Sequence, residues 1–114
     1  MDSFPYKTEI RHESWRNAEK LLASGAKFSL MSDHPVILQR NMFFTLRHLL
    51  RFGISKSDAI SKITREAADI IGVQSIGQLK PGFKSSCVVW NGAPFSLLSY
   101  PILVVAKGNI VYKE

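Results

Sequence analysis

One short segment limits the folds open to this chain more than any other feature of the sequence. Residues 27–32 carry apolar side chains on both faces of an extended chain, and Asp33, His34 and Pro35 follow directly. Strands buried on both faces are typical of parallel sheets covered by helices, and a proline cannot extend a strand ladder. The pattern predicts a single buried strand that ends in a loop. Such a strand needs neighbours for its backbone groups.

Residues on both sides of this segment have helical periodicity. Apolar side chains, Trp15 among them, recur at helical spacing over residues 12–24, and Gly25 follows. A wider stripe lies over residues 41–52, before Gly53, and its members are Met42, Phe43, Leu46, Leu49 and Leu50. The spacing predicts two amphipathic helices, each ended by its glycine.

Two shorter helices are predicted next. Ser55 and Asp58 have the spacing of a capping box, with aspartate in the place of glutamate, and they open a helix that runs through Ile63. Thr64 can cap a further helix that extends to Ile71.

The character of the chain changes after residue 72, because glycine and proline become frequent and helical periodicity is lost. Strands are predicted over residues 87–90, 102–106 and 110–112. Residues 107–109 have the composition of a tight hairpin turn. We therefore expect an α/β chain, with a helical part over residues 1–74 and a small β unit over residues 75–114.

Length and composition exclude several classes of protein. A chain of 114 residues is too short for a complete (β/α)8 barrel, which needs about 200 residues or more. No apolar run approaches the roughly 18 residues that span a membrane, so we expect no membrane insertion. The one cysteine, Cys87, cannot form an internal disulfide, and the first residues lack the pattern of a secretory signal. We expect a cytoplasmic protein.

The charge balance raises nucleic acid as a partner. Fifteen basic and nine acidic residues give a net charge of +6, yet neither half of the chain is a basic tail. No acid lies between Asp33 and Asp58, whereas this interval holds Arg40, Arg47, Arg51 and Lys56. These side chains predict a solvated basic face; the alternative is a small helical module that binds nucleic acid.

Few residues can carry catalytic chemistry. The three histidines, His12, His34 and His48, form none of the usual metal-binding motifs. Ser32, Asp33 and His34 cannot form a catalytic triad, because neighbours on a strand point to opposite faces. Asp33 follows a predicted buried strand, which is where barrel enzymes keep catalytic groups, although a carboxylate there could equally cap the loop.

Several segments, taken together, resemble the C-terminal end of the metal-dependent amidohydrolases, closest to the imidazolonepropionase-related group. Residues 25–36, GAKFSLMSDHPV, resemble that group's eighth barrel strand, close to AGVKVALMTDHPV. Residues 64–72 are similar to the helix that follows, with Glu66 and Ala67 in the place of Asn-Pro. Residues 76–94 resemble IGSIEPGKDADLVVWDGDP, with Ser85, Ser86 and Cys87 replacing Ala-Asp-Leu. Residues 107–111 resemble the closing hairpin.

The resemblance implies a fold and a chemistry. It implies the last strand and helices of a (β/α)8 barrel, followed by short antiparallel strands of a small β-sandwich domain. It gives Asp33 the role of the aspartate that binds the metal or takes a proton from metal-bound water, and places His34 beside the substrate. The hydroxide so formed attacks a cyclic or linear amide.

The resemblance also implies that most of the catalytic site lies elsewhere. The family's other metal ligands lie upstream of the residues present here, so the divalent metal, zinc or similar, belongs to the complete enzyme and none is expected in this chain. As partners we expect the missing N-terminal barrel portion or a second copy of the chain. An interaction subunit that completes a separately encoded barrel half is a further alternative.

We predict that nucleic acid binds weakly at most. Neutralisation of phosphates by about four basic side chains gives an affinity that falls with salt, with a log–log slope of about −3 to −4 and no sequence preference. Fluorescence anisotropy with two unrelated duplexes, titrated at several salt concentrations, measures both quantities. Sub-micromolar, sequence-selective binding at physiological salt would contradict the prediction.

Overall fold

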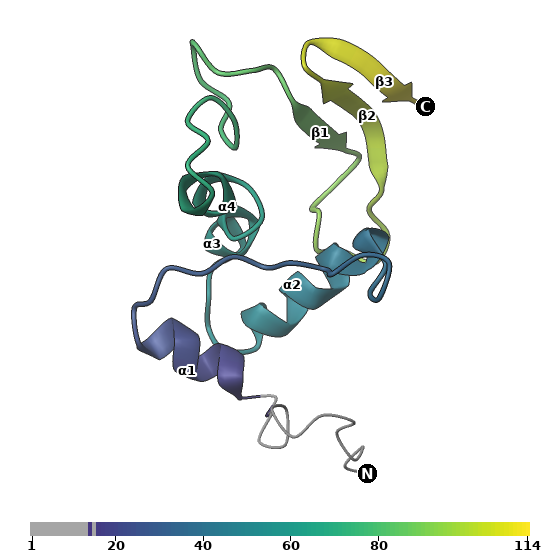
Figure 1. Ribbon diagram of the computed structural model, residues 1–114. Coiled ribbons are helices and arrows are strands. Elements are labelled where there is room, and N and C mark those ends of the chain that lie inside the picture. The colour runs from purple at the N-terminus through teal and green to yellow at the C-terminus, as the bar shows by residue number, and fades with distance from the viewer. Residues whose placement is uncertain (1–13, 15) are drawn as a thin grey trace.

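The computed structural model describes residue 14 and residues 16–114. Figure 1 shows the helices grouped around α2, with a three-stranded sheet beyond one end of that helix. In chain order the elements are α1 (Asn17–Ala23), η2 (Gln39–Asn41), α2 (Met42–Leu50), α3 (Lys56–Ser61), α4 (Arg65–Ile70), β1 (Cys87–Trp90), β2 (Pro101–Ala106) and β3 (Asn109–Lys113). None of the helices described is long and apolar enough to cross a membrane.

The core lies where α2 packs against α3. Leu46 and Leu49 of α2 and Ala59 of α3 are buried, as the predicted apolar stripe requires. Partly buried side chains from other parts of the chain surround them, among them Ala18, Phe28, Leu30, Ile63 and Phe95. The predicted helix over residues 41–52 is thus confirmed with slightly narrower bounds. The helix predicted over residues 12–24 is described from Asn17, and its first part, with His12 and Trp15, lies outside the described residues.

The capping predictions have different outcomes. Ser55 Oγ accepts a hydrogen bond from the Asp58 amide at 3.0 Å and donates to Asp58 Oδ2 at 2.7 Å, so the cap of α3 is confirmed. Thr64, in contrast, gives α4 no side-chain cap. Its Oγ1 donates to the Ile60 carbonyl at 2.9 Å, because the end of α3 offers an acceptor close by. The predicted Thr64 cap is wrong for this reason.

The strand predicted over residues 27–32 is wrong. This segment is neither helix nor strand, and Figure 1 shows it running as an open stretch across the helices. Its Phe28 and Leu30 side chains do pack against the core. Nor does the segment pair with the C-terminal strands, because β1, β2 and β3 pair only with one another in the described structure. Without a neighbouring strand, the segment has the side-chain burial of a strand but no ladder.

The predicted β segments form an antiparallel sheet in the order β1-β2-β3. The hairpin between β2 and β3 turns on Lys107 and Gly108, both with positive φ, of 51° and 83°. Positive φ at both central residues is what a two-residue type I′ turn requires, and its twist matches that of the strands. The predicted hairpin is therefore confirmed.

Aromatic side chains join α2 to the sheet. The Phe43 ring of α2 lies 5.0 Å from the ring of Trp90, which ends β1, and 5.3 Å from the ring of Phe95. Both contacts are tilted, a favourable geometry for aromatic pairs. They hold one end of α2 against the β part of the chain.

The backbone at Gly77 lies close to the backbone of Thr64, and a substitution there can test this contact. Gly77 has a φ of +83°, and a Cβ there would lie 2.8 Å from the Thr64 carbonyl oxygen, whereas Gly82, at +87°, faces open space. Alanine at either position loses about 1–2 kcal/mol to the left-handed backbone. We expect Gly77→Ala to lower the free energy of unfolding by about 1–3 kcal/mol more than Gly82→Ala, because backbone must also shift. Urea unfolding of both variants measures the difference, and equal losses would contradict the close approach.

Candidate functional site

Asp33 lies in the turn that follows the open segment. Its backbone has a φ of +53°, and its carbonyl accepts a hydrogen bond from the Val36 amide at 2.9 Å. The side chain is exposed, and within the described part of the chain its carboxylate has no hydrogen-bond partner. A loop cap would engage that carboxylate with backbone amides. The capping alternative therefore does not describe Asp33, and the carboxylate is left available for chemistry.

His34 is exposed beside Asp33 and has a local contact. Its Nδ1 accepts a hydrogen bond from the Gln39 amide at 3.4 Å, which ties the turn to the start of η2. Asp33 and His34 thus lie side by side in one exposed turn.

Apolar side chains flank this pair and are open to solvent. Met31 is 81% exposed, Val36 is 79% exposed, and Ile37 and Leu38 are also exposed. Contiguous apolar groups on a soluble protein commonly mark a contact surface. The candidate site is therefore a carboxylate and an imidazole with exposed apolar side chains on either side of them in the sequence.

The chain offers little for a metal beyond Asp33. Among residues 14 and 16–114, no three histidine, cysteine, aspartate or glutamate side chains come together as a metal site. A catalytic zinc typically needs three protein ligands and an open position for water. Asp33 can supply one such ligand, so the described residues alone do not fit a catalytic metal.

The four basic residues of the nucleic-acid alternative differ in their exposure to solvent. Arg40, Arg51 and Lys56 are exposed, but Arg47 is half-buried. Its Nη2 donates to the Ser96 carbonyl at 3.3 Å, and its guanidinium lies 4.9 Å from the centre of the Phe44 ring. Arg47 thus links α2 to the loop before β2. This arrangement weakens the idea of one basic face.

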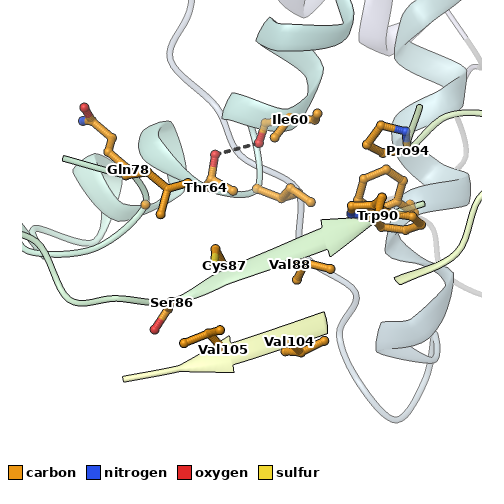
Figure 2. Close-up of a pocket in the computed structure, with 14 residues that line it drawn as sticks. Ile60, Thr64, Gln78, Ser86, Cys87, Val88, Trp90, Pro94, Val104 and Val105 are labelled. Atoms are coloured by element: carbon orange, nitrogen blue, oxygen red, sulfur yellow. Dashed lines mark hydrogen bonds between the residues drawn. The ribbon is translucent and has the colours of Figure 1, made fainter. Parts of the chain in front are cut away.

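A cavity of about 530 Å³ separates α3 and α4 from the sheet. Figure 2 shows Cys87 and Val88 of β1 and Val104 and Val105 of β2 on one side of it, and Ile60 on the other. Its few polar side-chain groups are hydroxyl, thiol, amide and indole groups, and the Thr64 hydroxyl is already bonded to the Ile60 carbonyl. The lining has no carboxylate, imidazole or ammonium, and Asp33 is not part of it. This cavity is an apolar gap in packing rather than a catalytic centre.

Comparison with known proteins gives the family. The model of the amidohydrolase family matches residues 3–111, so the chain belongs to that family. It is 25% identical, over 114 residues, to Amidohydrolase tasK of Hapsidospora irregularis, a match that covers 99% of this chain and 12% of that protein.

Solved structures agree on the fold. The chain superposes on an amidohydrolase from Thermotoga maritima with a TM-score of 0.87 and 31% identity, covering 98% of this chain and 30% of that one. A second solved amidohydrolase gives a TM-score of 0.75 at 19% identity, over 94% of this chain and 28% of the other. The chain thus spans less than a third of each relative. Membership of the amidohydrolase family is thus established, and the nucleic-acid alternative finds no support.

The contacts of Arg47 predict a cost for losing its guanidinium. We expect Arg47→Met to lower the free energy of unfolding by about 1–2 kcal/mol, because a partly buried hydrogen bond and a cation–π contact are lost while the aliphatic stem is kept. The matched Arg40→Met, at an exposed position, should change it by less than about 0.5 kcal/mol. Thermal unfolding monitored by circular dichroism measures both. An Arg47→Met variant as stable as Arg40→Met would show that the Ser96 contact contributes nothing.

Proposed function

We propose that this chain supplies the last barrel segment, its helices and the following β unit of a metal-dependent amidohydrolase that hydrolyses carbon–nitrogen bonds in small cyclic or linear amides. The observation that carries the proposal is the state of Asp33: an exposed carboxylate with no hydrogen-bond partner among the described residues, directly after a segment whose side chains pack on the helices. Membership of the amidohydrolase family supports it.

The open segment fits this role in its backbone as well. Phe28 and Leu30 pack towards α2, while within the described structure the backbone of residues 27–32 makes no hydrogen bonds. A strand in a parallel barrel receives its backbone partners from strands on both sides. We propose that strands outside this chain fill that need. They come from the remaining barrel portion, as part of the same protein or as a separate chain, and a second copy is the other source to test.

Asp33 is the residue we propose for the chemistry. A carboxylate with no competing hydrogen bond can accept a proton or bind a cation. In the complete enzyme a divalent metal such as zinc would need further ligands from outside this chain, because the described residues offer no set of three. We propose that His34, beside it, faces the substrate amide. The imidazolonepropionase-related group is the proposed subfamily, on the sequence of residues 25–36.

The remaining parts of the proposal concern organisation. We propose that residues 1–74 belong to the barrel and residues 75–114 to the small β domain. The three-stranded antiparallel sheet lies wholly within the second part, which supports this division. A cytoplasmic location is proposed from the single cysteine alone.

We predict that the chain alone neither retains zinc nor hydrolyses amides, because one exposed carboxylate cannot hold the ion. Elemental analysis after dialysis against zinc, with a hydrolysis assay on imidazolone and small cyclic amides, measures both. When the remaining barrel portion is present, Asp33→Asn should lower kcat/KM by about 10²–10⁴-fold, a usual range for a lost acid–base group.

The control for this experiment is Asp69→Asn, which removes an exposed carboxylate from α4 and should leave kcat/KM unchanged. Two results would contradict the proposal. One is stoichiometric metal in the chain alone that is lost on Asp33→Ala. The other is an assembled enzyme that Asp33→Asn leaves fully active.

A further inference from the structure

A part-buried ion pair joins the two short helices next to the open segment. Lys62, directly after α3, is only 8% exposed, and its Nζ lies 2.5 Å from Oε2 of Glu66 in α4. The second carboxylate oxygen, Oε1, accepts a hydrogen bond from Ser61 at 3.1 Å. Both oxygens of Glu66 are therefore engaged, and the carboxylate is fixed from two directions. The other ion pair of the described residues, Arg16 with Glu19, has exposed side chains.

The ammonium of this pair also touches the segment that leads to Asp33. Lys62 Nζ lies 4.3 Å from the centre of the Phe28 ring, within the range of a cation–π contact. Such contacts are stronger when the cation is removed from water, as it is here. Glu66, Lys62 and Phe28 thus form one connected set that runs from α4 to the open segment.

This set matters because little else fixes the segment. In the structure as described, residues 27–32 have no backbone hydrogen bonds, and Ala26 is held at their start by a 3.2 Å bond to Ser24 Oγ. The position of the segment therefore depends on the side chains that anchor it to the helices. Phe28 is one of these anchors, and it is packed between the apolar core and the Lys62 ammonium.

We propose that Lys62 and Glu66 are positioning residues that hold Phe28 in place and so set where the segment delivers Asp33. The inference rests on the proposed function in one respect, which is that Asp33 is taken to act in the reaction. Glu66 and Ala67 stand where the pattern that residues 64–72 resemble has Asn-Pro. Neither residue contacts a reacting atom. Their effect passes through the Phe28 ring.

The test separates this action from a general effect on the fold. In Glu66→Ala the buried ammonium loses its carboxylate, and Lys62 should turn to water and leave Phe28, because an unpaired buried charge is costly. In the double variant Lys62→Met with Glu66→Ala, no cation is buried, and the thioether can pack on the ring. The Ser61 hydroxyl loses its acceptor in both variants. A difference between them therefore reports on Lys62 and Phe28 alone.

Backbone order parameters from ¹⁵N relaxation of the full chain are the readout. For residues 27–33 we expect order parameters of about 0.85 in the unchanged chain and below about 0.6 in Glu66→Ala. In the double variant they should return to about 0.85. Residues of α2 should keep their values throughout. The matched control, Glu19→Ala, breaks the exposed ion pair and should change nothing in residues 27–33. The Lys62 ε-protons report the ring contact directly through their upfield ring-current shift.

Several results would overturn the proposal. These are a segment already below about 0.6 in the unchanged chain, an unaltered segment in Glu66→Ala, or a double variant that fails to restore order. If Glu66→Ala does not fold, the same comparison is made with Glu66→Gln, which keeps the shape of the side chain. None of these readouts uses Asp33 chemistry, so loss of the positioning effect and failure of Asp33→Asn in the hydrolysis assay are separate findings.

Discussion

The structure depends on the burial of one side chain, Leu46 of α2. It is the large side chain that the described part of the chain encloses completely, and Leu49 and Ala59 extend the same contact to α3. Helix α1 reaches this point through Ala18, and the open segment reaches it through Phe28 and Leu30. Because a fully buried leucine makes several tens of atomic contacts, a core of this size can organise a short chain only if each element touches it. The arrangement of the elements that pack around this core therefore depends on α2.

The sheet is attached to this core at few points. Phe43 reaches Trp90 and Phe95, and Arg47 reaches the Ser96 carbonyl, whereas the nearby cavity leaves the middle of the sheet without contact to α3 and α4. All of β3 is exposed. The core is small and one strand of the sheet is exposed along its whole length, so many large apolar side chains of this chain remain in contact with solvent. The chain also matches less than a third of the length of each relative.

The parts of the fold that could be predicted from the sequence are those decided by local chemistry. The stripe of α2, the Ser55 cap and the hairpin at Gly108 depend on residues within a few positions of one another. The segment 27–32 could not be predicted correctly by the same means, because a strand is defined by its neighbour and not by its own residues. Arg47 shows the same limit, since its acceptor lies 49 residues away.

The residues of the candidate site also differ in whether a local sequence pattern predicts them. Asp33 was found from its place after an apolar segment, and the structure leaves its carboxylate free of the cap that was the alternative. The pair of Lys62 and Glu66 was missed, although their spacing of four residues is a known signal for an ion pair on a helix. Here the two residues lie on either side of the break between α3 and α4. The Phe28 contact, 34 positions earlier in the chain, has no local signal at all.

The open segment has a consequence for how a partner strand would pair with it. Fixing the backbone of a single residue costs about 1–2 kcal/mol of conformational entropy, and forming a strand pair normally requires this from both chains. In residues 27–32 part of that ordering is already supplied by the packing of Phe28 and Leu30 on the helices. A neighbouring strand would therefore meet a partly ordered backbone, and more of the hydrogen-bond energy would appear as binding. In such a pairing the helices would already hold residues 27–32 in place before a neighbouring strand binds.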